Sequence, residues 1–188
     1  NDFILKEPKR EIWFKEILSA REYLNGRTRW CLWLEGIDEK DISSMPFLKK
    51  IIEDVREIRL KSSRPELAEI PHLFAQRTQP EDMECVIIPR VSSERRQYLP
   101  VGFINSSEHK VTDSLFTIAT NQPYVFGIVS SRLHTTWLKS IGGKMKTDFQ
   151  YSKNIVYNTF PFPKINQKQK EQINLHVFAV LEEREKHS

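Results

Sequence analysis

The residues best suited to chemistry in this 188-residue sequence form a polar segment between two apolar runs, Arg90-Val91-Ser92-Ser93-Glu94-Arg95-Arg96-Gln97. This segment combines guanidinium groups, hydroxyls, a carboxylate and an amide. Such groups read base edges in the major groove of DNA, where arginine pairs with guanine, glutamate accepts from cytosine and glutamine suits adenine. A solvated hairpin tip has the same composition, so both interpretations stay open from these residues alone.

A second basic cluster contains Lys139, Lys144, Lys146 and Lys153. Lysines at such positions neutralise phosphates, and each contact steepens the salt dependence of binding. Lysines are also ordinary surface residues, and that interpretation is the simpler one here. A third set, Lys49, Lys50, Arg56 and Arg59, occupies one face of an expected helix and is typical of a solvated face.

Several classes of enzyme site leave no signature in this sequence. None of the six glycines forms a G-x-G or P-loop pattern, so the turns that bind nucleotides are absent. The five histidines lack the four-residue spacing of a helical zinc site, and Ser-x-x-Lys and G-x-S-x-G are also missing. We therefore expect neither a cofactor nor a metal in this chain.

Apolar periodicity predicts the elements of the first half. Apolar residues at helical spacing predict a helix over residues 11–24, ended by Asn25-Gly26, and the uncharged run 30–34 predicts a buried strand. A helix is expected over about 44–60, with Ser44 as its N-cap and Pro46 in its first turn. Residues 62–82 are expected to be mainly loop, with a short helical turn near 66–69.

The second half is expected to hold a sheet followed by helices. Apolar runs at 86–91, 98–104 and 115–119 predict three strands. Pro89 and Pro100 cannot donate to a central ladder and are therefore expected at edges, bulges or strand starts. One helix is expected from about 121 to 141, stopped by Gly142-Gly143, and a final helix over about 167–185. The predicted fold class is α+β, a small mostly antiparallel sheet with flanking helices and a C-terminal helix.

Composition fits an ordinary globular protein. Hydrophobic residues make up 39% and charged residues 29%, and the net charge of +4 permits a polyanionic partner without demonstrating one. No apolar run approaches the length of a membrane span. Cys31 and Cys85 have no spacing typical of zinc sites or disulfide frameworks, and we expect two buried thiols in a reducing cytoplasm. Because the first residue is Asn1, the chain is expected to be part of a longer protein.

An ordered series of short motifs resembles one known family. The series consists of 23–26 (YLNG) with 29–34 (RWCLWL), 55–59 (VREIR), 89–103 (PRVSSERRQYLPVGF), 126–138 (FGIVSSRLHTTWL) and 157–163 (YNTFPFP). In this order it is similar to the C-terminal part of MmeI-like DNA methyltransferases, bacterial restriction-modification enzymes of the fused type IIG kind. The resemblance covers nearly the whole chain from Tyr23 onward.

The resemblance implies a target-recognition region that follows an adenine-N6 methyltransferase domain and binds double-stranded DNA. The Asn-Pro-Pro-Tyr motif and the cofactor-binding glycine motif of that family have no counterpart here, so the fragment itself is expected to be non-catalytic. S-adenosylmethionine is then implied for the parent enzyme only. The implied partners are double-stranded DNA and the methyltransferase domain of the same polypeptide, with no membrane. The expected domains are a connecting segment at 1–40, the recognition domain at 41–165 and a terminal helix at 166–188.

The resemblance also implies which residues meet DNA. The segment entering the major groove corresponds to Arg90, Ser92, Ser93, Glu94, Arg95 and Arg96. Further candidates are His109, Lys110, Asp113, Lys144 and Lys146, with Arg132 and His134 as phosphate contacts. For the helix motif around Ser130, Ser131 and Trp137, a packing role is the favoured interpretation. Two alternatives remain: a protein-protein interaction module with no DNA-reading role, and a stand-alone enzyme.

Overall fold

The structure is a computed structural model that describes the backbone of residues 8–187 and the side chains from residue 11 onward. The chain divides into two compact units. Unit 1 takes residues up to Lys15 together with Trp30–Thr78, and unit 2 takes Glu16–Arg29 together with Gln79 onward. The predicted boundaries at residues 40 and 165 stay a prediction, and part of the segment 1–40 lies outside the described residues.

Unit 1 is built around two consecutive helices, α3 (Glu39–Ser44) and α4 (Pro46–Leu60). Its other elements are the 3-10 helix η1 (Pro8–Trp13), the strand β2 (Trp30–Leu32) and the 3-10 helix η2 (Pro65–Glu69). The core consists of Leu34, Met45 and Leu48. The expected short helical turn within residues 62–82 is confirmed by η2.

Two predictions for unit 1 were wrong in detail. Ser44 is not the N-cap of α4, because it ends α3 and its hydroxyl donates to the Asp41 carbonyl at 2.8 Å. Met45 takes the N-cap position instead. The strand at 30–34 is only three residues long and is not uniformly buried, since Trp30 is 60% exposed and Cys31 is half-buried.

The central sheet of unit 2 is antiparallel, with the order β5–β3–β7. Its strands are β5 (Gly102–Asn105), β3 (Glu84–Pro89) and β7 (Leu115–Ala119). Because side chains alternate along β3, Val86 and Ile88 enter one core while Cys85 and Ile87 enter another. The small antiparallel sheet and the buried Cys85 predicted from the sequence are confirmed.

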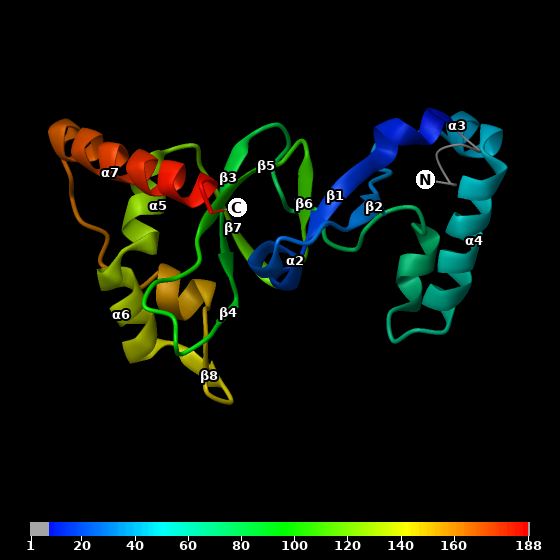
Figure 1. Cartoon of the computed structure of the whole chain (residues 1–188). Coiled ribbons are helices and arrows are strands. Elements are labelled where there is room, and N and C mark those ends of the chain that lie inside the picture. Colours follow the sequence, from blue (N-terminus) through cyan, green and yellow to red (C-terminus); the bar gives the residue numbers. More distant parts are fainter. Residues whose placement is uncertain (1–7, 188) are drawn as a thin grey trace. The chain divides into compact units, whose positions relative to one another are not determined.

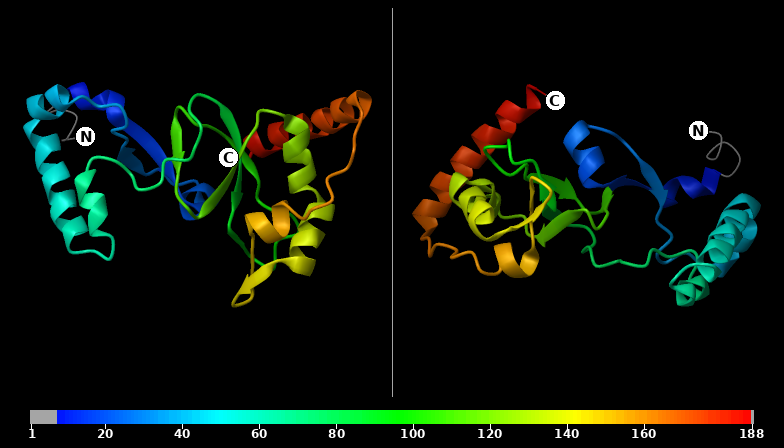
Figure 2. Two further views of the ribbon diagram at one scale, coloured as in Figure 1. Left: turned by 180° about the vertical axis from the view of Figure 1, so that it is seen from behind. Right: turned by 90° about the horizontal axis from the view of Figure 1, so that it is seen from below.

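Different elements pack against the two faces of this sheet. The helices α5 (Pro123–Ser130), α6 (Arg132–Ile141) and α7 (Gln167–Glu185) lie together on one side (Figure 1, Figure 2). Their residues Phe126, Leu138 and Val177 share a core with Val86. The other face packs against Leu18 of β1 (Phe14–Leu18) and residues of α2 (Ala20–Asn25). The α+β class with a C-terminal helix is therefore confirmed.

The helix predicted over residues 11–24 was wrong in its first part. Residues 14–18 form β1, whose second half pairs in parallel with β6 (His109–Val111). The partner strand lies some 90 residues further along the chain, so the local apolar pattern could not indicate this pairing. The turn after residue 24 is confirmed, because Gly26 has φ 58° and ends α2 in the left-handed conformation that glycine adopts without strain.

The helix predicted from 121 to 141 is two helices separated at Ser131. Ser131 has an extended backbone, and its hydroxyl accepts a hydrogen bond at 3.1 Å from the N–H of His134, so it caps α6. The predicted strand at 98–104 is also shorter than expected. Residues 98–101 are irregular, although Leu99 and Val101 are buried. The final helix has the predicted bounds, and its N-terminus is fixed by a capping box of Asn166 and Gln169.

Candidate nucleic-acid interface

A third sheet in unit 2 brings the two predicted basic clusters together. It has the order β4–β9–β8, with strands β4 (Val91–Ser92), β9 (Asp148–Gln150) and β8 (Gly143–Met145). Ser92 is paired with Phe149, and Phe149 is paired with Lys144. Segment 90–97 and hairpin 143–150 therefore lie side by side although they are some 50 residues apart in sequence (Figure 1). We call this sheet, with residues 93–97 and Lys139, the basic sheet.

Most polar side chains of segment 90–97 point to solvent. Arg90, Glu94, Arg95, Arg96 and Gln97 are exposed, and Ser93 is half-buried. Ser92 is only 5% exposed. Its hydroxyl is therefore not on the surface in this conformation, and its role as a DNA contact stays a prediction. Its position inside β4 explains the burial, because the pairing with Phe149 turns it toward the protein.

Aromatic rings and backbone groups fix the basic side chains of the sheet. The Lys139 and Lys144 ammonium nitrogens lie 5.8 and 5.4 Å from the centroid of the Phe149 ring. Lys139 also donates to the carbonyl of Arg96 at 3.3 Å, which joins α6 to the loop. The Arg90 guanidinium carbon lies 5.6 Å from the Phe116 centroid. Such cation–π contacts orient cations while leaving their charge available.

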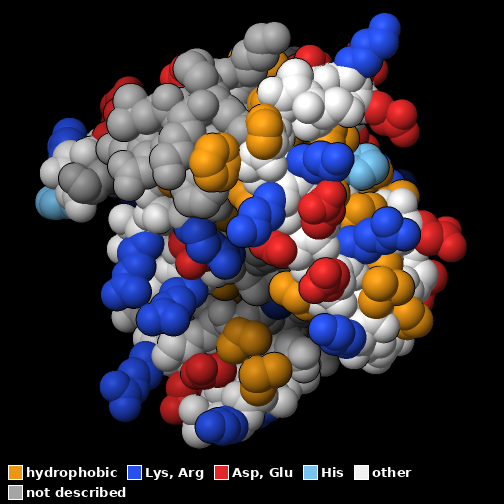
Figure 3. Space-filling view, turned by 90° about the vertical axis from the view of Figure 1, so that its right-hand side faces the viewer, with side chains coloured by type: hydrophobic (Ala, Val, Ile, Leu, Met, Phe, Trp, Pro, Cys, Tyr) orange, Lys and Arg blue, Asp and Glu red, His pale blue; other side chains and the backbone are white. Residues whose placement is uncertain are grey.

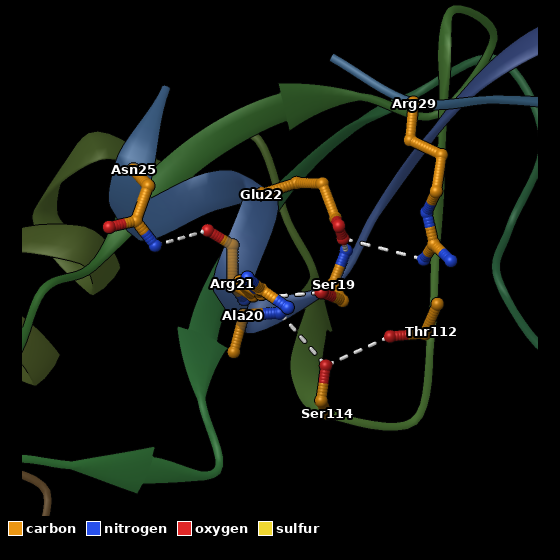
Figure 4. A network of polar contacts seen from close by, with 8 residues as sticks. All are labelled: Ser19, Ala20, Arg21, Glu22, Asn25, Arg29, Thr112 and Ser114. Atoms are coloured by element: carbon orange, nitrogen blue, oxygen red, sulfur yellow. Dashed lines mark hydrogen bonds and ion pairs between the residues drawn. The ribbon is translucent and has the colours of Figure 1, made fainter. Parts of the chain in front are cut away.

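The backbone of Arg90 is held from two sides. Its N–H donates to the carbonyl of Ser114 at 2.9 Å, and its carbonyl accepts from the N–H of Tyr151 at 2.7 Å. The Ser114 hydroxyl accepts from the N–H of Ala20 at 2.8 Å and bonds to the Thr112 hydroxyl at 2.9 Å (Figure 4). The start of segment 90–97 is therefore connected through Ser114 to the N-terminus of α2.

The start of α2 is itself rigid. The Glu22 carboxylate accepts from the N–H of Ser19 at 2.9 Å and pairs with Arg29 at 3.4 Å (Figure 4). Hydrogen bonds from the side chain and backbone of Ser19 hold the pKa of Glu22 below its ordinary value. The capping box and the ion pair therefore stabilise the same ionised form of this carboxylate.

The β8–β9 hairpin is the feature that the sequence analysis missed. All three residues of β8 are exposed, including Met145 at 53%, and Lys146 in the turn has φ 58°. The hairpin follows Gly142 directly, so the only local signal was the Gly142-Gly143 pair, which was interpreted as a helix stop. The structure places Lys144 and Lys146, two predicted contacts, at this exposed hairpin.

His109, Lys110 and Asp113 lie on a different sheet, at β6 and the turn that follows it. The His109 Nε2 is 3.3 Å from a Glu16 carboxylate oxygen. Lys110 is only 5% exposed in this conformation, and its role as a DNA contact stays a prediction. Asp113 is exposed. The structure therefore does not join these three residues to the basic sheet.

Arg132 and His134 of α6 differ completely in exposure. Arg132 is exposed, whereas His134 has no exposed surface and its Nε2 lies 2.8 Å from the Tyr151 hydroxyl. Burial lowers the pKa of His134 to about 4, so the ring is neutral at neutral pH. His134 is therefore not accessible in this structure, and its role as a phosphate contact stays a prediction. The packing role expected for this helix motif is confirmed, since His134 contacts Phe160 edge-on with centroids 4.4 Å apart.

The charged face of α4 in unit 1 shows mixed character. Basic, acidic and hydrophobic side chains are interspersed on the face of unit 1 seen in Figure 3. Arg59 donates to the carbonyls of Leu67, Ile70 and Leu73 at 2.7–2.9 Å, so its guanidinium stabilises the segment after η2. Lys49, Lys50 and Arg56 are exposed, as expected for a solvated face, whereas Arg59 is half-buried and has a structural role.

Two further observations bear on the type of site. In residues 8–187, no three His, Cys, Asp or Glu side chains gather as a metal ion would require. Over the same part of the chain, no helix combines the length and hydropathy needed to cross a membrane.

Comparison with known proteins identifies the family. The family model of the MmeI target recognition domain matches residues 1–164. The chain belongs to the MmeI target recognition domain family. The resemblance inferred from the ordered motifs is thereby confirmed.

Two relatives of this MmeI-type recognition domain are informative. One is DNA methyltransferase A of Bacillus subtilis strain 168, 33% identical over 187 residues, which are 98% of this chain and 21% of the relative. The other is the type IIL restriction-modification enzyme MmeI, solved in complex with DNA, with a TM-score of 0.93 and 37% identity over 99% of this chain and 25% of that one. The chain thus spans a fifth to a quarter of the length of these relatives.

Proposed function

We propose that this chain is the sequence-specific, double-stranded DNA recognition module of a restriction-modification methyltransferase. Membership of the MmeI target recognition domain family supports this proposal, as does the likeness to MmeI, which was solved in complex with DNA. The likeness to DNA methyltransferase A supports methylation as the activity of the whole protein. In this proposal the chain recognises DNA, and a methyltransferase domain elsewhere on the same polypeptide performs the chemistry.

The observation that carries the proposal is the basic sheet. Six basic residues, at positions 90, 95, 96, 139, 144 and 146, belong to the basic sheet or directly adjoin it, against two acidic ones at 94 and 148. An excess of positive charge on one exposed surface attracts the phosphate backbone, while guanidinium forks, Glu94 and Gln97 offer specific pairing to base edges. Affinity and specificity would then come from the same surface.

The buried residues leave a smaller set of candidate contacts. We assign base reading to Arg90, Ser93, Glu94, Arg95 and Arg96, and backbone contacts to Lys144 and Lys146 at the hairpin. His109, Asp113 and Arg132 are secondary candidates, since they are accessible but lie on other elements.

The parent enzyme would use S-adenosylmethionine, the methyl donor of such methyltransferases. This chain contains neither a glycine-rich turn nor an Asn-Pro-Pro-Tyr motif, so its residues do not fit that cofactor, and the binding site belongs to another part of the polypeptide. Residues 1–40 would connect that part to the recognition domain, and the assembled protein would act in the cytoplasm.

Fluorescence anisotropy with labelled DNA duplexes tests the proposal. We expect affinity to fall steeply between about 50 and about 200 mM salt, and the double variant Arg95→Ala plus Arg96→Ala to reduce both affinity and preference among sequences. Arg56→Ala, an exposed arginine on the mixed-charge face of α4, is the matched control and should bind as the wild type does. Binding that is indifferent to salt and unaffected by the double variant would contradict DNA reading and favour a protein-protein interaction module.

A further inference from the structure

One hydrophobic side chain stands among the charged groups of the basic sheet. Met145 is the last residue of β8, the edge strand of that sheet, and it is 53% exposed. The β8–β9 hairpin projects from the body of unit 2 after α6 (Figure 1, Figure 2). A single exposed apolar side chain is ordinary on a protein surface, so the surroundings of Met145 must decide what it does.

The hairpin that carries Met145 has a very short turn. Met145 pairs with Asp148, so only Lys146 and Thr147 connect the two strands. Lys146 has φ 58°, a left-handed conformation that glycine adopts far more readily than lysine. Non-glycine residues held in this conformation gather at ligand-binding sites. Here the unusual backbone conformation brings a cation to the tip of the hairpin, directly after Met145.

The two faces of the hairpin differ in chemistry. Lys144 pairs with Phe149, and its ammonium nitrogen lies 5.4 Å from the centroid of the Phe149 ring. Because side chains alternate along a strand, Met145 and Asp148 lie on the face opposite this cation–π pair. Met145 therefore has a lysine on each side of it in the chain but presents an apolar thioether side chain of its own.

This combination fits a partner that is both anionic and locally apolar. The major groove of B-DNA is such a partner, because phosphates line its edges and the thymine 5-methyl group is the apolar feature of its floor. The groove is also wide enough to admit a two-stranded β-ribbon. The lysines of the hairpin would then meet phosphates while Met145 meets base edges.

The position of the hairpin within the basic sheet favours DNA over a protein partner. Strand β9 separates β8 from β4, which begins segment 90–97. Two strand spacings of about 4.8 Å amount to about 10 Å, a span comparable to the major-groove width of about 12 Å. The base-reading side chains assigned above are all polar, so none of them is suited to recognise a methyl group.

We propose that Met145 is a specificity-determining residue that contacts the 5-methyl group of one thymine in the major groove, beside the bases read by segment 90–97. The inference rests on the proposed function. It adds to that function an apolar contact, whose contribution to binding depends on the base and not on the phosphate charge.

Replacing thymine by uracil removes the contacted methyl group and tests the proposal directly. The probe is a duplex containing the site that the wild-type chain selects from a pool of randomised sequences, with each thymine replaced in turn. Uracil at one position should weaken binding of the wild type about three- to fivefold, the effect expected from losing one buried methyl group. Met145→Ala should bind the thymine and uracil duplexes equally. Met145→Leu keeps an apolar side chain and should restore the difference.

Controls separate this contact from folding and from phosphate binding. Leu175→Ala removes another exposed hydrophobic side chain, on α7, and should respond to uracil as the wild type does. Met145→Ala should keep the wild-type slope of log K against log salt, whereas Lys144→Ala should reduce that slope by about 1. Thermal melting should give the same Tm for the wild type and Met145→Ala, since the side chain is exposed.

The outcomes distinguish this contact from DNA recognition as a whole. If the wild type selects a site but responds to uracil at no position, or if Met145→Ala keeps the wild-type response, the thymine contact is refuted while DNA recognition stands. If the wild type selects no sequence, the proposed function itself fails. If 2-aminopurine fluorescence reports base unstacking that Met145→Ala abolishes, without any response to uracil, Met145 is a wedge between base pairs and the methyl assignment is wrong.

Discussion

The buried pair of His134 and Tyr151 should make the stability of this protein depend on pH. His134 has no exposed surface, its Nε2 is 2.8 Å from the Tyr151 hydroxyl, and its Nδ1 has no hydrogen-bond partner among the described residues. Tyr151 also donates its N–H to Arg90 at 2.7 Å. The pair is thus connected through Tyr151 to the start of segment 90–97. Protonation of the His134 ring should destabilise the fold at this point.

The size and sign of the effect follow from the pKa of His134. Burial lowers this pKa from 6.5 in an exposed histidine to about 4. Between these values the unfolded chain binds a proton that the folded chain does not, so the stability present above pH 6.5 is lost as the pH falls. The loss amounts to about 1.4 kcal/mol between about pH 7.5 and about pH 5.5, and approaches about 3 kcal/mol below pH 4.

Urea denaturation measured across this pH range gives the free energies of unfolding. The variant His134→Gln keeps a polar group opposite Tyr151 but does not titrate, so the wild type should lose about 1.4 kcal/mol more than the variant on acidification to about pH 5.5. The subtraction cancels the contribution of His72, whose pKa burial also lowers. His176→Gln, an exposed histidine on α7, is the matched control and should follow the wild type. Parallel profiles for the wild type and His134→Gln would refute the reasoning.

Two other substitutions test the packing that supports the units. Arg59→Ala removes three hydrogen bonds to the carbonyls of residues 67, 70 and 73 and should lower the free energy of unfolding of unit 1 by about 2–3 kcal/mol. Arg56→Ala on the same helix is the control and should change this free energy little. Equal Tm values for the two variants would contradict the structural role of Arg59. Gly127→Val should destabilise the contact of α5 with α7 by about 2 kcal/mol, because a Cβ there would lie 2.6 Å from Ile173 and 2.9 Å from Val177. The control is Gly143→Val, because a Cβ at that position meets only ordinary contacts. Calorimetry gives the Tm of both variants. An unchanged Tm for Gly127→Val would show that α7 moves away without cost and would contradict the prediction.

Elements with strong local signals were predictable from the sequence. The bounds of α7 follow from its apolar spacing and from Asn166 and Gln169 at its start, and α4 follows from Pro46 and an amphipathic pattern. The three apolar runs correctly indicated an antiparallel sheet. The motif series also correctly indicated the family, because several short motifs in a fixed order are more specific than any one of them alone.

Elements that depend on distant partners were not predictable. Residues 14–18 have apolar spacing compatible with a helix, but pairing with residues 109–111 makes them a strand. The break at Ser131 depends on a choice between continuing a helix and capping a new one, and nothing within the local apolar pattern decides it. The short hairpin at 143–150 gave too little periodicity to be recognised.

The amino-acid sequence by itself determined the helices with clear caps, the strands of the central sheet and the residue types able to read DNA, because these depend on local periodicity and chemistry. The tertiary structure alone decided which of those residues reach solvent together. It buried Ser92, Lys110 and His134, left Arg95 and Arg96 exposed, and placed segment 90–97 beside a hairpin some 50 residues away. Burial and pairing of this kind depend on contacts between distant segments, and such contacts form only when the whole chain packs.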